Sequence, residues 1–259
     1  MVKWVGVAGL AFLLLTCGGK SVRLDAQVHS TADKSYPGVF CKPSGGPVGI
    51  GFSPLGHYTS DSSYVQAAET ACRLLSWSTR VRVKGERLFE RTPLGALEFR
   101  GESFELLDLP ELTPESCHLD SLAVDRHAWI VAVPEGAAVA SGGETIFSSE
   151  QPGWISEMPR DAGWLYSLGI SPISFRNEPG TWEMATYQAL VELAASIAPR
   201  VGTVDKTSDG RVWSATVHEV DTELRGFEVA GRWRDRSHAY VLARVPAAAA
   251  VSRLSSSPE

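Results

Sequence analysis

The chain lacks several features that mark common classes of protein. Its 259 residues include 24 lysines and arginines against 30 acidic residues, which gives a formal net charge of -6. This mild acidity excludes the basic footprint of a general nucleic-acid-binding protein. No apolar run reaches the roughly 18 residues that a membrane-spanning helix needs. Because hydrophobic residues make up 44% of the chain and charged residues 21%, the composition predicts a globular body with a packed core.

The chain also lacks the short motifs of familiar enzymes. It has no G-x-S-x-G, no H-E-x-x-H, no phosphate-binding loop and no dinucleotide-binding fingerprint. His127 and His238 each precede an apolar segment, and we interpret both as strand-edge residues rather than as a paired catalytic site. Glu219, Asp221 and Asp235 are interpreted as solvated surface carboxylates. The sequence therefore predicts no catalytic residue and no cofactor, and a secreted hydrolase with an unfamiliar site is kept as a weaker alternative.

Cysteines are few, with four in the chain, one of them in the N-terminal leader. The other three leave room for one disulfide and one free thiol. Cys72 falls in a helical pattern and is expected to be a small buried hydrophobe. Cys41 and Cys117 lead into predicted strands and are the candidates for a disulfide, although sequence cannot test their separation. Cys117, His118 and His127 lack a second close pair of ligands, so no metal site is predicted.

The N-terminus has the pattern of a secretory signal. Lys3 precedes an apolar run of 12 residues, 4–15 (WVGVAGLAFLLL), which is too short to span a membrane as a helix. The run ends in Leu-Leu-Thr-Cys-Gly-Gly, which resembles a bacterial lipobox. The resemblance implies that Cys17 becomes the acylated first residue of the mature chain, carrying a palmitate-type anchor. Gly18 then points to the outer membrane, and an ordinary signal peptide cut elsewhere is the alternative.

The remaining chain contains an internal repeat. Aligned at an offset of 118, residues 50–83 and 168–201 share nine identities in 34 positions. Five of these step by three or four residues, which traces one face of a helix in each copy. The alignment predicts a duplicated domain, each copy having a strand that ends in Ser-Pro, a long helix and a closing apolar strand. Shorter blocks repeat at nearby offsets: 37–40 with 152–155, and 127–132 with 238–243.

Local patterns predict further elements. Ser63 and Thr181 are expected to be the N-caps of the two long helices, with Gln66 completing a capping box in the first copy. Segments 80–84 and 97–106 are expected to be strands, and Thr113-Pro114-Glu115 the start of a helix. In the second copy Trp213, Val217, Val220 and Leu224 follow helical spacing and predict a second amphipathic helix.

The predicted organisation follows from these elements. It consists of a signal peptide (1–16), a lipidated linker (17–36), a first repeat (37–136), a connector (137–150), a second repeat (151–246) and a disordered tail (247–259). Three tryptophans on apolar faces, Trp129, Trp182 and Trp213, are expected to pack in the core. Trp154 and Trp164 lie near the entry to the second repeat and are the first candidates for exposed contacts with a partner.

The second copy is similar to the LPP-twenty family of bacterial lipoproteins. The residues that carry the resemblance are 153–155 (GWI), 165–171 (LYSLGIS), Trp182, Ala185, Ala189, Leu193 and Ala194, 219–222 (EVDT), 233–235 (WRD) and 240–246 (YVLARVP). The resemblance covers about a hundred residues and implies an α+β domain with helices packed on a mostly antiparallel sheet. A related domain forms the N-terminal part of flagellar assembly protein T. The family has no established catalytic residues.

Taken together, the sequence predicts a lipid-anchored, non-enzymatic adaptor at the periplasmic face of the outer membrane. Its expected partners are the outer-membrane lipid, reached through acylated Cys17, and either an envelope protein or peptidoglycan. The alternative is a peptidoglycan-associated lipoprotein that regulates a cell-wall synthase. Residues Trp154 and Trp164 would contact the partner in either case.

Overall fold

A computed structural model describes residues 34–41, 46–55, 60–91, 96–124, 126–137, 143–197, 199–208 and 211–252. The expected signal peptide and Cys17 lie outside these residues. The described residues all belong to one compact unit, Thr31–Glu259. They form four α-helices and 13 strands in antiparallel sheets, which confirms the predicted α+β class. Among the described residues no helix is long and apolar enough to cross a membrane.

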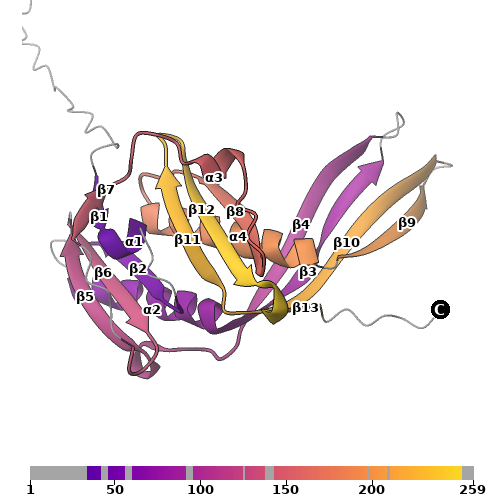
Figure 1. The fold of residues 1–259 in the computed structure, drawn as a ribbon. Coiled ribbons are helices and arrows are strands. Elements are labelled where there is room, and N and C mark those ends of the chain that lie inside the picture. Colours follow the sequence, from indigo (N-terminus) through magenta and orange to yellow (C-terminus); the bar gives the residue numbers. More distant parts are fainter. Residues whose placement is uncertain are drawn as a thin grey trace, which may run out of the picture. The chain divides into compact units, whose positions relative to one another are not determined.

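The first half of the unit is a three-stranded sheet packed on a long helix. Strands β2 (Gly49–Pro54), β6 (His127–Val133) and β5 (His118–Val124) lie in that order, all antiparallel. Helix α2 (Ser60–Thr79) packs on β2 and β6 (Figure 1). The sheet forms because β2 and β6 are almost entirely apolar and buried, as central strands covered by a helix must be.

The second half has the same arrangement. Strands β11 (Glu228–Arg234), β12 (His238–Pro246) and β8 (Trp164–Pro172) lie in that order, and helix α4 (Glu178–Ile197) packs on β8 and β12. Gly51 pairs with Ile130 in the first sheet, and Gly169 pairs with Val241 in the second. The aligned glycines therefore occupy the same place in both sheets.

These glycines let each helix lie directly on its sheet. A Cβ atom on Gly51 would lie 2.1 Å from the carbonyl oxygen of Ala67, and one on Gly169 would lie 1.8 Å from that of Ala185. Both alanines are completely buried. A side chain on either glycine would push the helix away, so the small residues fix the distance between the two layers.

The expected N-caps are wrong by one turn. Helix α2 begins at Ser60 and α4 at Glu178, so Ser63 and Thr181 are each the fourth residue of their helix. Their hydroxyls instead donate to the carbonyl oxygens that end the preceding strands, Ser63 to Pro54 at 2.7 Å and Thr181 to Pro172 at 3.5 Å. Each bond ties the first turn of the helix to the end of the strand before it.

The expected capping box of Gln66 is also absent. Its Oε1 accepts a hydrogen bond from the Ser53 hydroxyl at 3.1 Å, so Gln66 faces the strand and not the start of its own helix. The short helix expected at Thr113 does form, as a 3-10 helix over Pro114–Ser116 with Thr113 as its N-cap.

Two long hairpins join the halves in one sheet. Strands β3 (Arg80–Arg91) and β4 (Leu97–Asp108) form the first hairpin, and β9 (Arg200–Ser208) and β10 (Arg211–Arg225) form the second. The hairpins lie side by side because β3 pairs with β10 over Ala215–Arg225 (Figure 1). The sheet thus crosses from one repeat to the other.

The amphipathic helix expected at 213–224 is therefore wrong. The segment is part of β10, which pairs with β3 along one edge and with β9 and β13 (Ala250–Ser252) along the other. Val220, Thr222 and Leu224 alternate on one face and are buried. The apolar residues of this segment also fit a helical spacing. Valine and threonine favour a strand, however, and hydrogen bonding to partner strands on both edges stabilises the strand.

The two halves also share a core. One cluster of buried residues includes Trp129 and Val83 from the first half and Trp182 and Val220 from the second. The prediction that Trp129 and Trp182 pack in the core is confirmed, whereas the side chain of Trp213 lies outside the described residues. The common core means that the halves are packed as a single body.

The expected connector and tail both contribute strands. Within the connector, β7 (Glu144–Ile146) pairs with β1 (Ser35–Pro37), next to the short helix α1 (Gly38–Cys41). The tail expected to be disordered continues as a 3-10 helix, Ala247–Ala249, and as β13, because β10 leaves an open edge there. Residues 253–259 lie outside the described part. Helix α3 (Gly153–Ser156) precedes β8.

Candidate functional site

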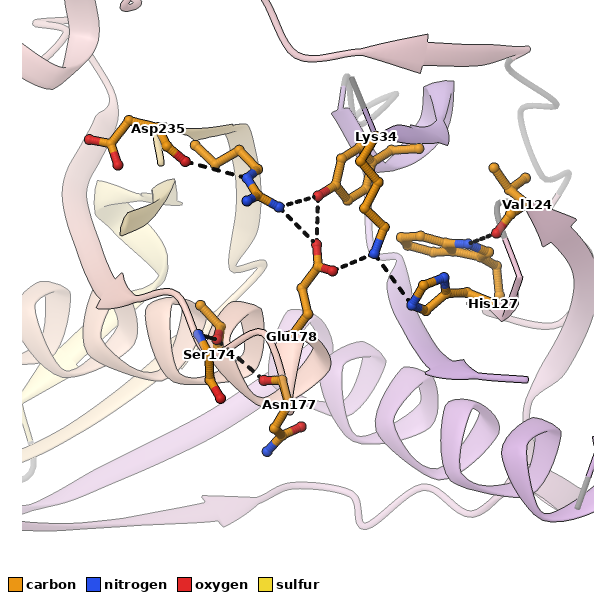
Figure 2. A network of polar contacts seen from close by, with 11 residues as sticks. Lys34, Val124, His127, Ser174, Asn177, Glu178 and Asp235 are labelled. Atoms are coloured by element: carbon orange, nitrogen blue, oxygen red, sulfur yellow. Dashed lines mark hydrogen bonds and ion pairs between the residues drawn. The ribbon is translucent and has the colours of Figure 1, made fainter. Parts of the chain in front are cut away.

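A polar network joins the two halves beside the shared core. Glu178, the first residue of α4, accepts hydrogen bonds from Lys34 and from the Tyr36 hydroxyl, the latter at 2.5 Å (Figure 2). Arg234, the last residue of β11, donates through Nη1 to the Tyr36 oxygen at 2.8 Å and to Glu178 Oε1 at 3.3 Å. One carboxylate is therefore shared by two cations and a phenol.

The fold explains how these residues meet. Strand β1 places Tyr36 in the core, fully buried and stacked on Phe40. Glu178 sits where α4 begins, and a carboxylate is favoured at the positive end of a helix dipole. Arg234 reaches the same point from the neighbouring strand end. Lys34, just before β1, closes the network and also donates toward His127 Nε2 at 3.3 Å.

Electrostatics make Glu178 an acceptor rather than an acid. Burial by itself would raise the pKa of Glu178, but Lys34, the Tyr36 hydroxyl and Arg234 outweigh it and hold the pKa below its usual value. Burial, reinforced by the negative charge of Glu178, raises the pKa of Tyr36 well above its usual value. Neither group can exchange a proton near neutral pH, so the network is suited to holding structure and charge rather than to acid–base catalysis.

A cleft of about 450 Å³ opens beside this network. Its lining combines basic, aromatic and small polar residues: Lys34, Tyr36, Ile146, Phe147, Ser148, Ser149, Trp233, Arg234, Asp235 and Arg236. The basic side chains outnumber the single carboxylate by three to one. The cleft therefore favours an anionic group over a cationic one.

The charged groups of the cleft differ in how far they are already engaged. The Asp235 carboxylate accepts from the backbone N–H groups of Ser237 and His238 and from the Tyr240 hydroxyl. Burial opposes ionisation, but these bonds outweigh it and lower the pKa of Asp235. Arg234 is nine-tenths buried, and within the described residues its Nη2 atom has no hydrogen-bond partner. Arg236 is exposed. Lys34 and Arg234 already donate to Glu178, and the Nη2 atom of Arg234 is itself shielded from solvent. Arg236 is therefore the exposed donor of the cleft, while the Asp235 acceptor is occupied.

The structure separates the two histidines that the sequence aligned. His127 lies against Lys34 and meets the Phe52 ring edge-on, whereas the backbone N–H of His238 donates to the Asp235 carboxylate. Asp235, expected to be solvated, instead accepts three hydrogen bonds in the turn before β12. Asp221, expected to be solvated, instead pairs with Arg82 through two bonds of 2.6 and 2.7 Å on the charged face of the hairpins.

The two tryptophans expected to be exposed are half-buried. Trp164 lies under the Arg244 guanidinium, whose carbon is 4.2 Å from the ring centre, and Arg244 is held in turn by Glu228. The Trp154 indole packs close to Gly231 of β11. Neither ring lines the cleft beside Glu178. Trp164 borders a different, open hollow at the start of β8.

The expected disulfide between Cys41 and Cys117 is wrong, because the structure places the two cysteines in separate clusters. Cys41 is in α1 and packs on the shared core, next to Arg232. Cys117 packs in the smaller cluster under α2, together with Cys72. The expected burial of Cys72 is confirmed. Among the described residues no group of histidine, cysteine and carboxylate side chains is arranged to hold a metal ion.

Sequence reasoning missed the network itself. The four residues of the network come from three distant segments, at 34–36, 178 and 234, and no spacing in the chain links these segments. Two of these residues lie in segments that the sequence did single out. Glu178 is three residues before Thr181, the expected start of the second long helix, and Arg234 belongs to the Trp-Arg-Asp stretch 233–235.

Comparisons with family models, with curated proteins and with solved structures gave no match for this chain.

Proposed function

We propose that the protein is a lipid-anchored, non-enzymatic adaptor of the bacterial cell envelope that binds an anionic group of a partner in the cleft beside Glu178. The observation that carries the binding role is the cleft itself, whose lining has three basic side chains, Lys34, Arg234 and the exposed Arg236, against the single carboxylate of Asp235. Arginine is well suited to carboxylates because its planar donors match their geometry.

The envelope location rests on the leader. The apolar run before Cys17 and the Leu-Leu-Thr-Cys pattern support export and acylation. The resemblance to the LPP-twenty family, carried by segments such as 165–171 and 240–246, supports the same class of lipoprotein. An acyl anchor would hold the folded unit near the outer membrane, with the cleft open to the periplasm.

A duplicated domain is part of the proposal. The identical placement of Gly51 and Gly169 against their helices, and the matching bonds of Ser63 and Thr181, support an origin of both halves from one ancestral unit. Only the second half supplies Glu178 and Arg234, while Lys34 and Tyr36 precede the first. The cleft is therefore lined by the segment before the first copy, by the connector and by the second copy.

The first partner class is an envelope protein that presents a carboxylate-rich segment. Peptidoglycan is the second candidate, because its peptides also carry free carboxylates, and Trp233 and Phe147 add aromatic surface to the same cleft.

Binding assays separate these partners. The mature chain with Cys17→Ser would be sedimented with purified sacculi and, separately, cross-linked to envelope membranes. Arg236→Glu should weaken the genuine interaction about tenfold, because an exposed basic residue of the cleft becomes acidic. Arg176→Glu is the matched control, since Arg176 is exposed and outside the cleft lining.

Each result has a defined meaning. A membrane protein cross-linked in an Arg236-dependent way supports the leading proposal, and Arg236-dependent sedimentation with sacculi supports the peptidoglycan alternative. If Arg236→Glu and Arg176→Glu behave like the wild type in both assays, the cleft is not the binding surface and the proposal is wrong.

A further inference from the structure

Two cysteine thiols lie against each other beneath α2. Cys72, in the middle of the helix, is completely buried, and Cys117, between the 3-10 helix and β5, is half-buried. Both belong to the small apolar cluster that separates α2 from β6, and the two thiols are within hydrogen-bonding reach of each other. They come from elements that are far apart in the sequence.

The surrounding structure holds this contact in place. Ser76, one turn after Cys72 on the same side of α2, donates its hydroxyl hydrogen bond to the carbonyl oxygen of Pro110. Leu112 and Leu119 pack into the same cluster on either side of Cys117. Polar and apolar contacts therefore hold the segment 110–119 against α2, which keeps both thiols in one cluster.

We propose that Cys72 and Cys117 form a disulfide that fastens α2 to the start of β5. The bridge would close a loop that contains the whole β3–β4 hairpin, including the strand through which the first half pairs with β10. A cross-link across such a loop stabilises the fold by restricting the unfolded chain. The small cluster is separate from the main core, so the link would add to the few apolar contacts that hold the two segments together.

The oxidation proceeds by thiol–disulfide exchange with a disulfide-bearing oxidant. The Cys117 thiolate attacks one sulfur of the oxidant and releases one thiol, which leaves a mixed disulfide on Cys117. The Cys72 thiolate then attacks the Cys117 sulfur, forms the Cys72–Cys117 bond and releases the second thiol of the oxidant. The two cysteines lose two protons and two electrons, and the oxidant is reduced to two thiols.

The environment predicts the order and timing of these steps. Cys117 reacts first because its thiol is the accessible one. Burial, with the neighbouring Cys117 thiol, raises the pKa of Cys72, so few Cys72 thiolates exist in the folded protein. The bridge should therefore form faster during refolding than after folding is complete. In an exported protein the oxidising compartment would supply the oxidant, but the chemistry can be tested without that assumption.

Cys41 is not a partner in this bridge. It packs on the main core in α1, beside Arg232, which donates to the Phe40 carbonyl at 3.0 Å and whose pKa burial lowers to about 10. Cys41 and the Cys72–Cys117 pair are therefore in different clusters, and Cys41 serves as an internal reference thiol.

The test uses the full chain with Cys17→Ser, which leaves three cysteines. The reduced, unfolded protein is refolded with glutathione and glutathione disulfide, and the free thiols are counted by N-ethylmaleimide labelling in denaturant and intact mass. One label per chain is expected, on Cys41, with a linked peptide pair that contains Cys72 and Cys117. The oxidised form should melt about 5–15 °C above the reduced form.

Matched variants make the outcome decisive. Cys41→Ser should keep the bridge and take up no label, whereas Cys117→Ser should take up two labels and lose the difference in melting temperature. Because Cys117 is half-buried, this variant is expected to fold, and circular dichroism checks that it does. Three labels on the refolded wild type, or a linked peptide that contains Cys41, would overturn the proposal. Peptide mapping of the wild type gives this answer even if a variant fails to fold.

Discussion

The Glu178 carboxylate offsets the positive charges of Lys34 and Arg234 near the shared core of the two halves. Both Lys34 and Arg234 pair with its carboxylate, and all three side chains are at least four-fifths buried. A buried ion pair contributes little when intact, but removing one partner leaves an uncompensated charge away from water. The network is therefore a point at which a single substitution should have a large effect.

Glu178→Gln should lower the free energy of unfolding at neutral pH by about 2–4 kcal/mol. The loss should also depend on pH. Because the pKa of Glu178 is lowered in the folded state, its carboxylate stabilises the protein above the ordinary pKa of a glutamate, and that contribution disappears as pH falls through the lowered folded value. Urea unfolding between pH 7 and pH 3 should show the wild type and the variant converging in acid.

The control for this series is Glu192→Gln, on the same helix. Glu192 is half-exposed and pairs with Arg87 on the surface, so its substitution should cost less than about 1 kcal/mol. An equal loss for both variants, or a Glu178→Gln defect that persists unchanged in acid, would contradict the assigned role of the network.

Gly51 and Gly169 give a second prediction at the residue scale. Changing either to alanine should lower the free energy of unfolding by about 3 kcal/mol, because the new Cβ would lie about 2 Å from a helix carbonyl oxygen. Gly202→Ala is the control, since a Cβ there meets nothing within 4 Å. Thermal unfolding of the three variants checks this, and a loss at only one of the paired sites would contradict the equivalence of the halves.

At the scale of elements, the sequence predicted the local units better than their connections. The spacing of the paired residues in 67–78 and 185–196 identified both long helices. The last pair of the predicted helical face, Arg82 and Arg200, is wrong, because these residues belong to β3 and β9. The apolar blocks at 127–132 and 238–243 are strands, as expected. The helix predicted at 213–224 was wrong because the apolar positions there fit both a helical and a strand period. Pairing with the neighbouring strands β3 and β9 makes the segment a strand.

Amide hydrogen exchange tests the reassignment of 213–224. Strand β10 is paired on both sides over Ala215–Glu219 and again over Thr222–Leu224, whereas β4 and β9 lie at the edges of the sheet. Amides of β10 should therefore exchange more slowly than those of β4 and β9. Faster exchange in β10 than in both edge strands would contradict the sheet order.

At the scale of the whole molecule, two repeats do not make two independent domains. The prediction of separate repeats could not anticipate the common core, because the repeat pattern describes each copy by itself and carries no information on contacts between copies. Trp129 and Trp182 come from different copies, and both contact Tyr36 and Phe40. For the same reason the polar network at Glu178 was invisible in the sequence. It exists only where the halves meet.

This shared core predicts a single cooperative unfolding transition. Tryptophan fluorescence, which reports on Trp129 and Trp182, and far-ultraviolet circular dichroism should give the same midpoint in urea. Residues 31–136 alone should not fold stably, because β3 would lose β10 and the core would lose Trp182. Two resolved transitions, or a folded first half, would show that the repeats are independent.

The proposed role as an anchored adaptor requires that Cys17 is acylated and holds the protein at the membrane. The measurement is the intact mass and membrane fractionation of the wild type beside Cys17→Ala. The wild type is expected to begin at Cys17 with an added acyl mass and to sediment with the outer membrane, and the variant is expected to do neither. An unmodified Cys17, with both proteins in the soluble fraction, would contradict it.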